Sequence, residues 1–141
     1  MANIIPDAFK SELLSGTHNF ANGGNSFKIA LYTDISGYST SSTAYTTSNE
    51  VSSSGTSYTA GGNALDSQAV AVASNTAFVD FADEVFSSVT LSAVGAVIYN
   101  DTNSDKLVVV LDFGGTKTAT NGDFTIQFPA AGASTAILRI A

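Results

Sequence analysis

From residue 67 onward, six short segments rich in β-branched and aromatic residues follow one another, and turn-forming residues separate them. They are residues 67–73, 77–81, 89–100, 106–113, 124–128 and 135–140. Short strands at this close spacing are typical of antiparallel β-sandwiches and barrels. The pattern predicts an all-β protein, an antiparallel β-sandwich or jelly-roll-like barrel, with Gly114-Gly115 and Asn121-Gly122 among the turns between strands.

Two more elements are expected near the start of the chain. Phe9 and Leu13 are four residues apart and follow Pro6, which suits a first helical turn, so residues 6–14 are predicted to form one short helix. Residues 27–33 alternate apolar and polar side chains in the way a half-buried strand does. The expected helix therefore precedes the first strand.

The chain has 141 residues, which is room for one domain. We expect an N-terminal segment, residues 1–27, that carries the helix, followed by a single β-sandwich domain, residues 28–141. Residues 94–99 and 107–111 are apolar at nearly every position, which indicates a central hairpin that is buried on both faces or that meets another subunit. Both runs are far shorter than the ~20 residues that span a bilayer, so no membrane association is expected.

Residues 34–63 interrupt this pattern with a long stretch of Ser, Thr and Gly. Such long loops are uncommon in compact domains and are usually functional or ordered by a partner. Tyr38, Tyr45 and Tyr58 lie in it, a combination typical of binding loops that contact a protein or a sugar. The alternative is a surface loop with short edge strands whose tyrosines fold back onto their own domain. The candidate interface residues are Phe9, Leu13, Tyr38, Tyr45 and Tyr58.

Charge and cysteine content exclude several kinds of partner. The chain carries five Lys and Arg against twelve Asp and Glu, a net charge of −7. Phosphate groups would be repelled, so nucleic acid is not an expected partner. There is no cysteine, which removes disulfides and thiolate chemistry. The first ten residues, MANIIPDAFK, lack the basic and apolar regions of a secretory signal.

His18 is the only imidazole of the chain. No GxSxG turn or other nucleophile motif accompanies it, so the sequence predicts no catalytic residue and no cofactor. A small hydrolase is the weakest alternative.

One acidic turn imitates a metal loop. Asp101, Asn103 and Asp105 have the spacing of the first calcium ligands of an EF-hand, but Lys106 stands where that loop needs glycine. Asn and Asp also favour β-turns by bonding their own backbone, so we expect a turn without a metal ion.

Several segments together are similar to one family of proteins. They are KIALYT (28–33), AYTTSNEV (44–51), YTAGG (58–62), AVIYND (96–101), VLDFG (110–114) and GDFTIQFP (122–129). In this order they resemble a group of small virion structural proteins of tailed bacteriophages, some of which look like head decoration or cement proteins. The likeness covers residues 27–129, and its segments are strands and turns rather than catalytic signatures.

The resemblance implies a protein that is made in the host bacterial cytoplasm and assembled into the virion. It implies a decoration protein that binds the major capsid protein, or other virion proteins, and stabilises the capsomer lattice, as a homo-oligomer with a trimer favoured. An acidic protein suits the outer capsid surface better than the side that faces DNA. The alternatives are a virion protein of the tail, neck or fibre, and a carbohydrate-binding β-sandwich module suggested by the tyrosines.

Overall fold

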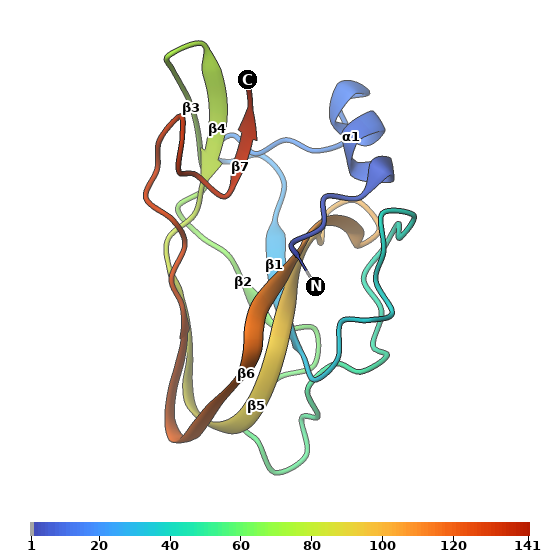
Figure 1. Cartoon of the computed structure of the whole chain (residues 1–141), viewed down its shortest axis with the longest axis vertical. Coiled ribbons are helices and arrows are strands. Elements are labelled where there is room, and N and C mark those ends of the chain that lie inside the picture. The colour runs from blue at the N-terminus through green and yellow to red at the C-terminus, as the bar shows by residue number, and fades with distance from the viewer. Residues whose placement is uncertain (1) are drawn as a thin grey trace.

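The structure is a computed structural model that describes residues 2–141, and these residues form one helix and seven strands (Figure 1). In chain order they are α1 (Asp7–Leu14), β1 (Phe27–Tyr32), β2 (Asn63–Ala64), β3 (Ala69–Ala73), β4 (Thr76–Asp80), β5 (Glu84–Asn100), β6 (Lys106–Ile126) and β7 (Leu138–Ile140). Within the described residues no helix is long and apolar enough to cross a bilayer.

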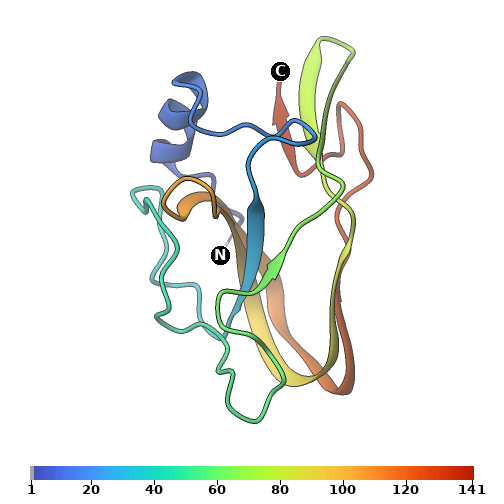
Figure 2. The same ribbon diagram turned by 180° about the vertical axis from the view of Figure 1, so that it is seen from behind.

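The strands form two antiparallel sheets. The larger has the order β2-β1-β5-β6, and the smaller has the order β3-β4-β7. Figures 1 and 2 show the smaller sheet and α1 together at one end of the molecule, beyond the larger sheet. The prediction of an all-β antiparallel protein with one short helix is confirmed. A sandwich or jelly-roll-like barrel is not, because neither sheet closes into a barrel.

One long hairpin replaces several of the expected shorter strands. β5 has 17 residues and β6 has 21, and they pair along most of their length. The predicted turns at Gly114-Gly115 and Asn121-Gly122 are wrong, because both lie inside β6. They mark irregularities in the pairing: residues 113–116 lie opposite the single residue Val94. Gly114, at φ +74°, supplies the left-handed conformation that such a bulge requires.

The larger sheet is covered on both faces where β1 lies beside residues 95–100 of β5, and along residues 107–111 of β6. On one face, side chains such as Ile29, Ile98 and Val108 belong to the main core. On the other face, Tyr32 and Val110 belong to a second apolar cluster, which the long segment before β2 helps to cover. The interpretation of residues 107–111 as a strand buried on both faces is therefore confirmed, and it explains why this run has no polar position.

Candidate interaction surface

An apolar groove lies between α1 and one face of the smaller sheet. Its cavity has a volume of about 660 Å³. Its floor is formed by Val70, Ala77, Val79, Leu138 and Ile140, and its wall by Phe9, Leu13 and Leu14. We call this feature the α1 groove. Its lining is predominantly apolar.

The register of the smaller sheet explains the apolar floor. Cross-strand partners point to the same face of a sheet. Two rows of partners therefore share the groove face, namely Val70, Val79 and Leu138, and Val72, Ala77 and Ile140. Val79 and Leu138 are buried, whereas Val72 is 72% exposed and Ile140 is 58% exposed. The apolar face thus continues from the core out into solvent.

Helix α1 forms the wall because a single side chain anchors it. Phe9 is buried, and its ring lies 4.9 Å from the ring of His18 and 6.1 Å from that of Phe20. Leu13 is only partly buried, and Leu14 is 91% exposed at the end of the helix. Of the two helix residues predicted for the interface, Phe9 is mainly a core residue and Leu13 lines the groove. Leu14 was missed, although two adjacent leucines cannot both face inward from one short helix.

His18 lies beneath the groove and connects α1 to the larger sheet. Its Nε2 is 2.8 Å from Oε2 of Glu12, whose other oxygen is 3.1 Å from Nζ of Lys106. Asn100 uses Oδ1 to accept two backbone N–H groups, so its amide nitrogen donates to Nδ1 of His18 at 3.0 Å. These contacts assign the proton to Nε2. The ring is fully engaged by a carboxylate and an amide, an arrangement that fixes the helix in place.

The acidic turn of residues 101–105 is held by its own backbone and by its neighbours. The Asn103 side chain donates to the carbonyl of Thr17, and Lys28 approaches Asp101 at 3.9 Å. Among the described residues no group of three or more His, Asp or Glu side chains is placed to hold a metal ion.

The three tyrosines predicted for the interface belong to the interior network instead. Tyr38 and Tyr58 are buried, and Tyr45 is partly buried with its ring stacked 4.5 Å from that of Tyr99. The assignment of Tyr38 and Tyr58 to a contact surface is therefore corrected. The alternative, in which these side chains fold back onto their own domain, matches the structure. The observation that suggested a carbohydrate-binding loop is removed with it.

Glu50 is the centre of this network. Its carboxylate accepts hydrogen bonds from the hydroxyl of Tyr45 at 2.5 Å, the hydroxyl of Tyr58 at 2.7 Å and the backbone N–H of Gly61 at 2.7 Å. The Tyr38 hydroxyl donates to that of Tyr32, which donates to the carbonyl of Thr46. Glu50 was not among the residues predicted from the sequence. The long segment is thereby fastened to the sheet.

Burial raises the pKa of several of these phenols above their ordinary value. Desolvation is the largest cause for Tyr32, Tyr38, Tyr58 and Tyr99, and the nearby Glu50 carboxylate adds to it. The network therefore depends on neutral tyrosines around one carboxylate.

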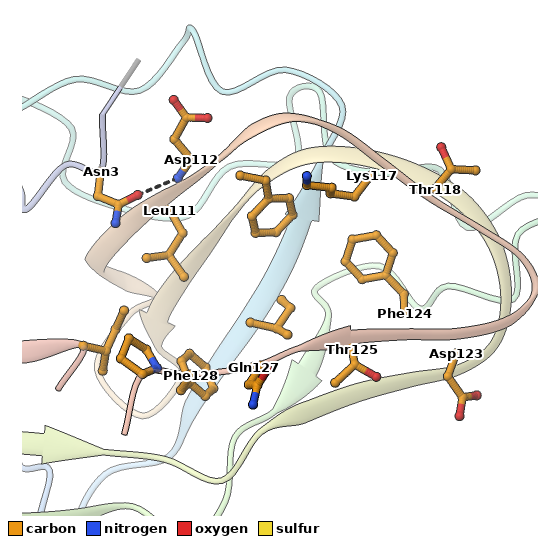
Figure 3. Close-up of a pocket in the computed structure, with 14 residues that line it drawn as sticks. Asn3, Leu111, Asp112, Lys117, Thr118, Asp123, Phe124, Thr125, Gln127 and Phe128 are labelled. Carbon is orange, nitrogen blue, oxygen red and sulfur yellow. Dashed lines mark hydrogen bonds between the residues drawn. The ribbon is translucent and has the colours of Figure 1, made fainter. Parts of the chain in front are cut away.

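A second cavity of about 520 Å³ lies beside β6 (Figure 3). Its apolar lining includes Leu111, Phe124 and Phe128, all of them buried side chains of the core. Figure 3 shows the backbone N–H of Asp112 donating to Oδ1 of Asn3 at its rim, at 2.8 Å. The lining is shared with the core, whereas the α1 groove exposes apolar side chains that the core does not use.

Comparison with known proteins gives no family for this chain: no family model matches it, and no curated protein and no solved structure matches it.

Proposed function

We propose that this chain is a structural protein of a phage virion, a decoration protein that attaches to the outer surface of the capsid through the α1 groove. The exposed apolar groove is the main observation that supports the proposal. The resemblance of residues 27–129 to small virion proteins, seen in the sequence alone, supports the class of assembly.

The exposed side chains of the groove would be stabilised by a partner. Single exposed apolar residues are normal on proteins, but contiguous apolar patches mark interaction sites. Here Leu14 and Ile140 line one concavity, and Val72 continues the same sheet face. Covering a fully exposed Leu or Ile contributes roughly 1.5–3 kcal/mol. These side chains can therefore supply much of the free energy of attachment.

The charges around the groove indicate which kind of partner segment can bind there. The chain has twelve Asp and Glu residues, yet none of them lines the groove. Two of its five cations, Lys10 and Arg139, do line it, and Lys10 forms an exposed ion pair with Asp7 at 3.0 Å. An apolar segment of a coat subunit, neutral or acidic, would meet no carboxylate among the lining residues, since Asp7 lies outside the lining and is paired with Lys10. We assign the groove to such a segment.

The groove is also preformed. Phe9 holds α1 against the core, and His18 joins the helix region to Asn100 of β5. A surface that is already ordered loses little conformational entropy on binding. Several copies on one shell, each contacting neighbouring capsomers, would oppose their separation even if each contact is weak, because linked contacts act at high effective concentration.

The double substitution Leu14→Gln with Ile140→Thr tests this assignment. Both side chains are exposed, so the fold should persist, while loss of their burial should weaken binding to undecorated shells at least tenfold. Binding is measured by cosedimentation with shells of the phage that encodes the chain. The rise in temperature at which shells release their DNA, measured with and without added protein, should be reduced in parallel.

Val85→Thr is the matched control. Val85 is a partly exposed strand residue outside the groove, and its change removes a similar apolar contact elsewhere. This variant should bind and protect shells like the unmodified protein. If unmodified protein neither binds shells nor raises their release temperature, the decoration function is wrong.

A further inference from the structure

The free edge of β3 is an unprotected strand at one end of the molecule. β3 is the outermost strand of the order β3-β4-β7, and all five of its residues are exposed. Figures 1 and 2 both show the β3–β4 hairpin projecting at the end of the molecule. Among residues 2–141, no strand pairs with the outer side of β3.

The hairpin geometry shows which backbone groups are available. Ser74 and Asn75 connect β3 to β4, and their φ values of 49° and 63° are those of a type I′ turn. In such a hairpin the closing pair, Ala73 and Thr76, is hydrogen-bonded, and bonded pairs then alternate along the ladder. The N–H and C=O groups of Val70 and Val72 therefore point to the open edge. Within residues 2–141 no hydrogen bond reaches them from outside the hairpin.

Natural proteins usually protect such an edge. Lysine, proline, inward charges or a β-bulge prevent pairing with another chain. β3 has the sequence AVAVA and contains none of these, and its ladder with β4 has no register shift. An edge without protection indicates a strand that is paired when the protein functions.

We infer that β3 pairs antiparallel with β3 of a second copy of this chain, about a two-fold axis at Ala71, to form a continuous six-stranded sheet. In this register Ala69 lies opposite the second copy's Ala73, and Val70 lies opposite the second copy's Val72. The outward backbone groups of the two valines then bond each other in both directions. The register pairs the whole of the strand.

A second copy is favoured over other occupants by sequence symmetry and charge. AVAVA reads the same in both directions, so antiparallel pairing places valine against valine and alanine against alanine. Two chains of net charge −7 repel each other, and β3 is a contact without any charged side chain. Self-pairing at this edge therefore meets little electrostatic cost.

The two-fold axis determines the relative orientation of the two copies. Antiparallel pairing of one edge with itself requires a two-fold axis perpendicular to the sheet, so the same face of both copies lies on one side. The two α1 grooves then open on the same side of the combined sheet. This symmetry gives a dimer rather than the trimer favoured from the sequence, and it does not depend on attachment to a capsid.

Cysteine cross-linking tests the axis. Ala71 would meet the second copy's Ala71 as a non-hydrogen-bonded pair, with Cα atoms about 4.5 Å apart, which suits a disulfide. The chain has no cysteine of its own. Under mild oxidation Ala71→Cys should give covalent dimers in high yield. Ala69→Cys alone should give few covalent dimers, because Ala69 lies opposite the second copy's Ala73 and not opposite a second Ala69. A mixture of the Ala69→Cys and Ala73→Cys variants should form covalent dimers.

Equal cross-linking of Ala69→Cys and Ala71→Cys, or none for Ala71→Cys, would overturn the pairing. A second measurement is sedimentation velocity over a range of concentrations. Val72→Pro removes an N–H that points away from β4, so the hairpin should persist while dimerisation weakens at least tenfold. Val72→Thr keeps that N–H and should still dimerise. A protein that is monomeric throughout, or trimeric, contradicts the inference.

Discussion

Replacing Glu50 with alanine is expected to lower the free energy of unfolding by about 3 kcal/mol or more. The substitution leaves the hydroxyls of Tyr45 and Tyr58 and the N–H of Gly61 without their acceptor. Hydrogen bonds to a charged group contribute roughly 1.5–3 kcal/mol each, and unsatisfied buried groups add a penalty. Since domains are stable by only about 5–15 kcal/mol, the loss is large. Urea unfolding followed by circular dichroism measures it.

Two further variants make the Glu50 result specific. Glu50→Gln keeps an acceptor oxygen but places an amide against one of the donors, so its loss should be intermediate. Asp66→Ala removes an exposed carboxylate outside the network and should change stability by less than about 0.5 kcal/mol. If Glu50→Ala unfolds at the same urea concentration as Asp66→Ala, the network does not hold the long segment to the sheet.

Raising the pH above about 10, the ordinary pKa of tyrosine, is expected to unfold the protein in one cooperative step. Burial raises the pKa of Tyr32, Tyr38, Tyr58 and Tyr99, so above that pH the folded state binds more protons than the unfolded state. Stability is then lost with rising pH, by up to about 1.4 kcal/mol per pH unit for each tyrosine that stays protonated. Below that pH these groups are neutral in both states and have no effect.

Two signals recorded in one alkaline titration check this expectation. The ultraviolet absorbance of tyrosinate and the far-ultraviolet circular dichroism should change together, because the phenols ionise only when the network opens. Returning the sample to neutral pH should restore the folded spectrum. If tyrosinate appears gradually near the ordinary pKa while the circular dichroism stays constant, these phenols are accessible to solvent and the network is wrong.

Local sequence patterns predicted the helix and the strand whose formation depends mainly on residues that are close in sequence. The helix of α1 and the strand of β1 follow from spacing and alternation, and the structure has them within a residue or two of the expected bounds. The division of β6 was wrong because Gly114-Gly115 supplies the same backbone freedom to a bulge as to a turn. Only the length of the partner strand β5 distinguishes a bulge from a turn here. The pairing of β5 with β6 depends on residues that are far apart in sequence.

The interaction surface was harder to predict because exposure depends on what covers a residue. The segment that forms β3 was expected to be a strand, but nothing in AVAVA shows that all of its side chains remain exposed. For the tyrosines a signal was present: Glu50 is the only charged residue between Asp34 and Asp66. A lone carboxylate among hydroxyl-bearing side chains indicates a buried hydrogen-bonded network more than a binding loop.

Electron microscopy of mature particles tests the proposed function most directly. On the proposal that a phage encodes the chain, the particles are those of that phage. The protein carries its label at Thr120 of β6, an exposed position outside the α1 groove. The proposal predicts label over the outer surface of the head, at regular positions between capsomers, with α1 facing the shell. Label confined to the tail, neck or fibres would show that the chain is a virion protein located there and not on the head. Particles without label would contradict a structural role in the virion.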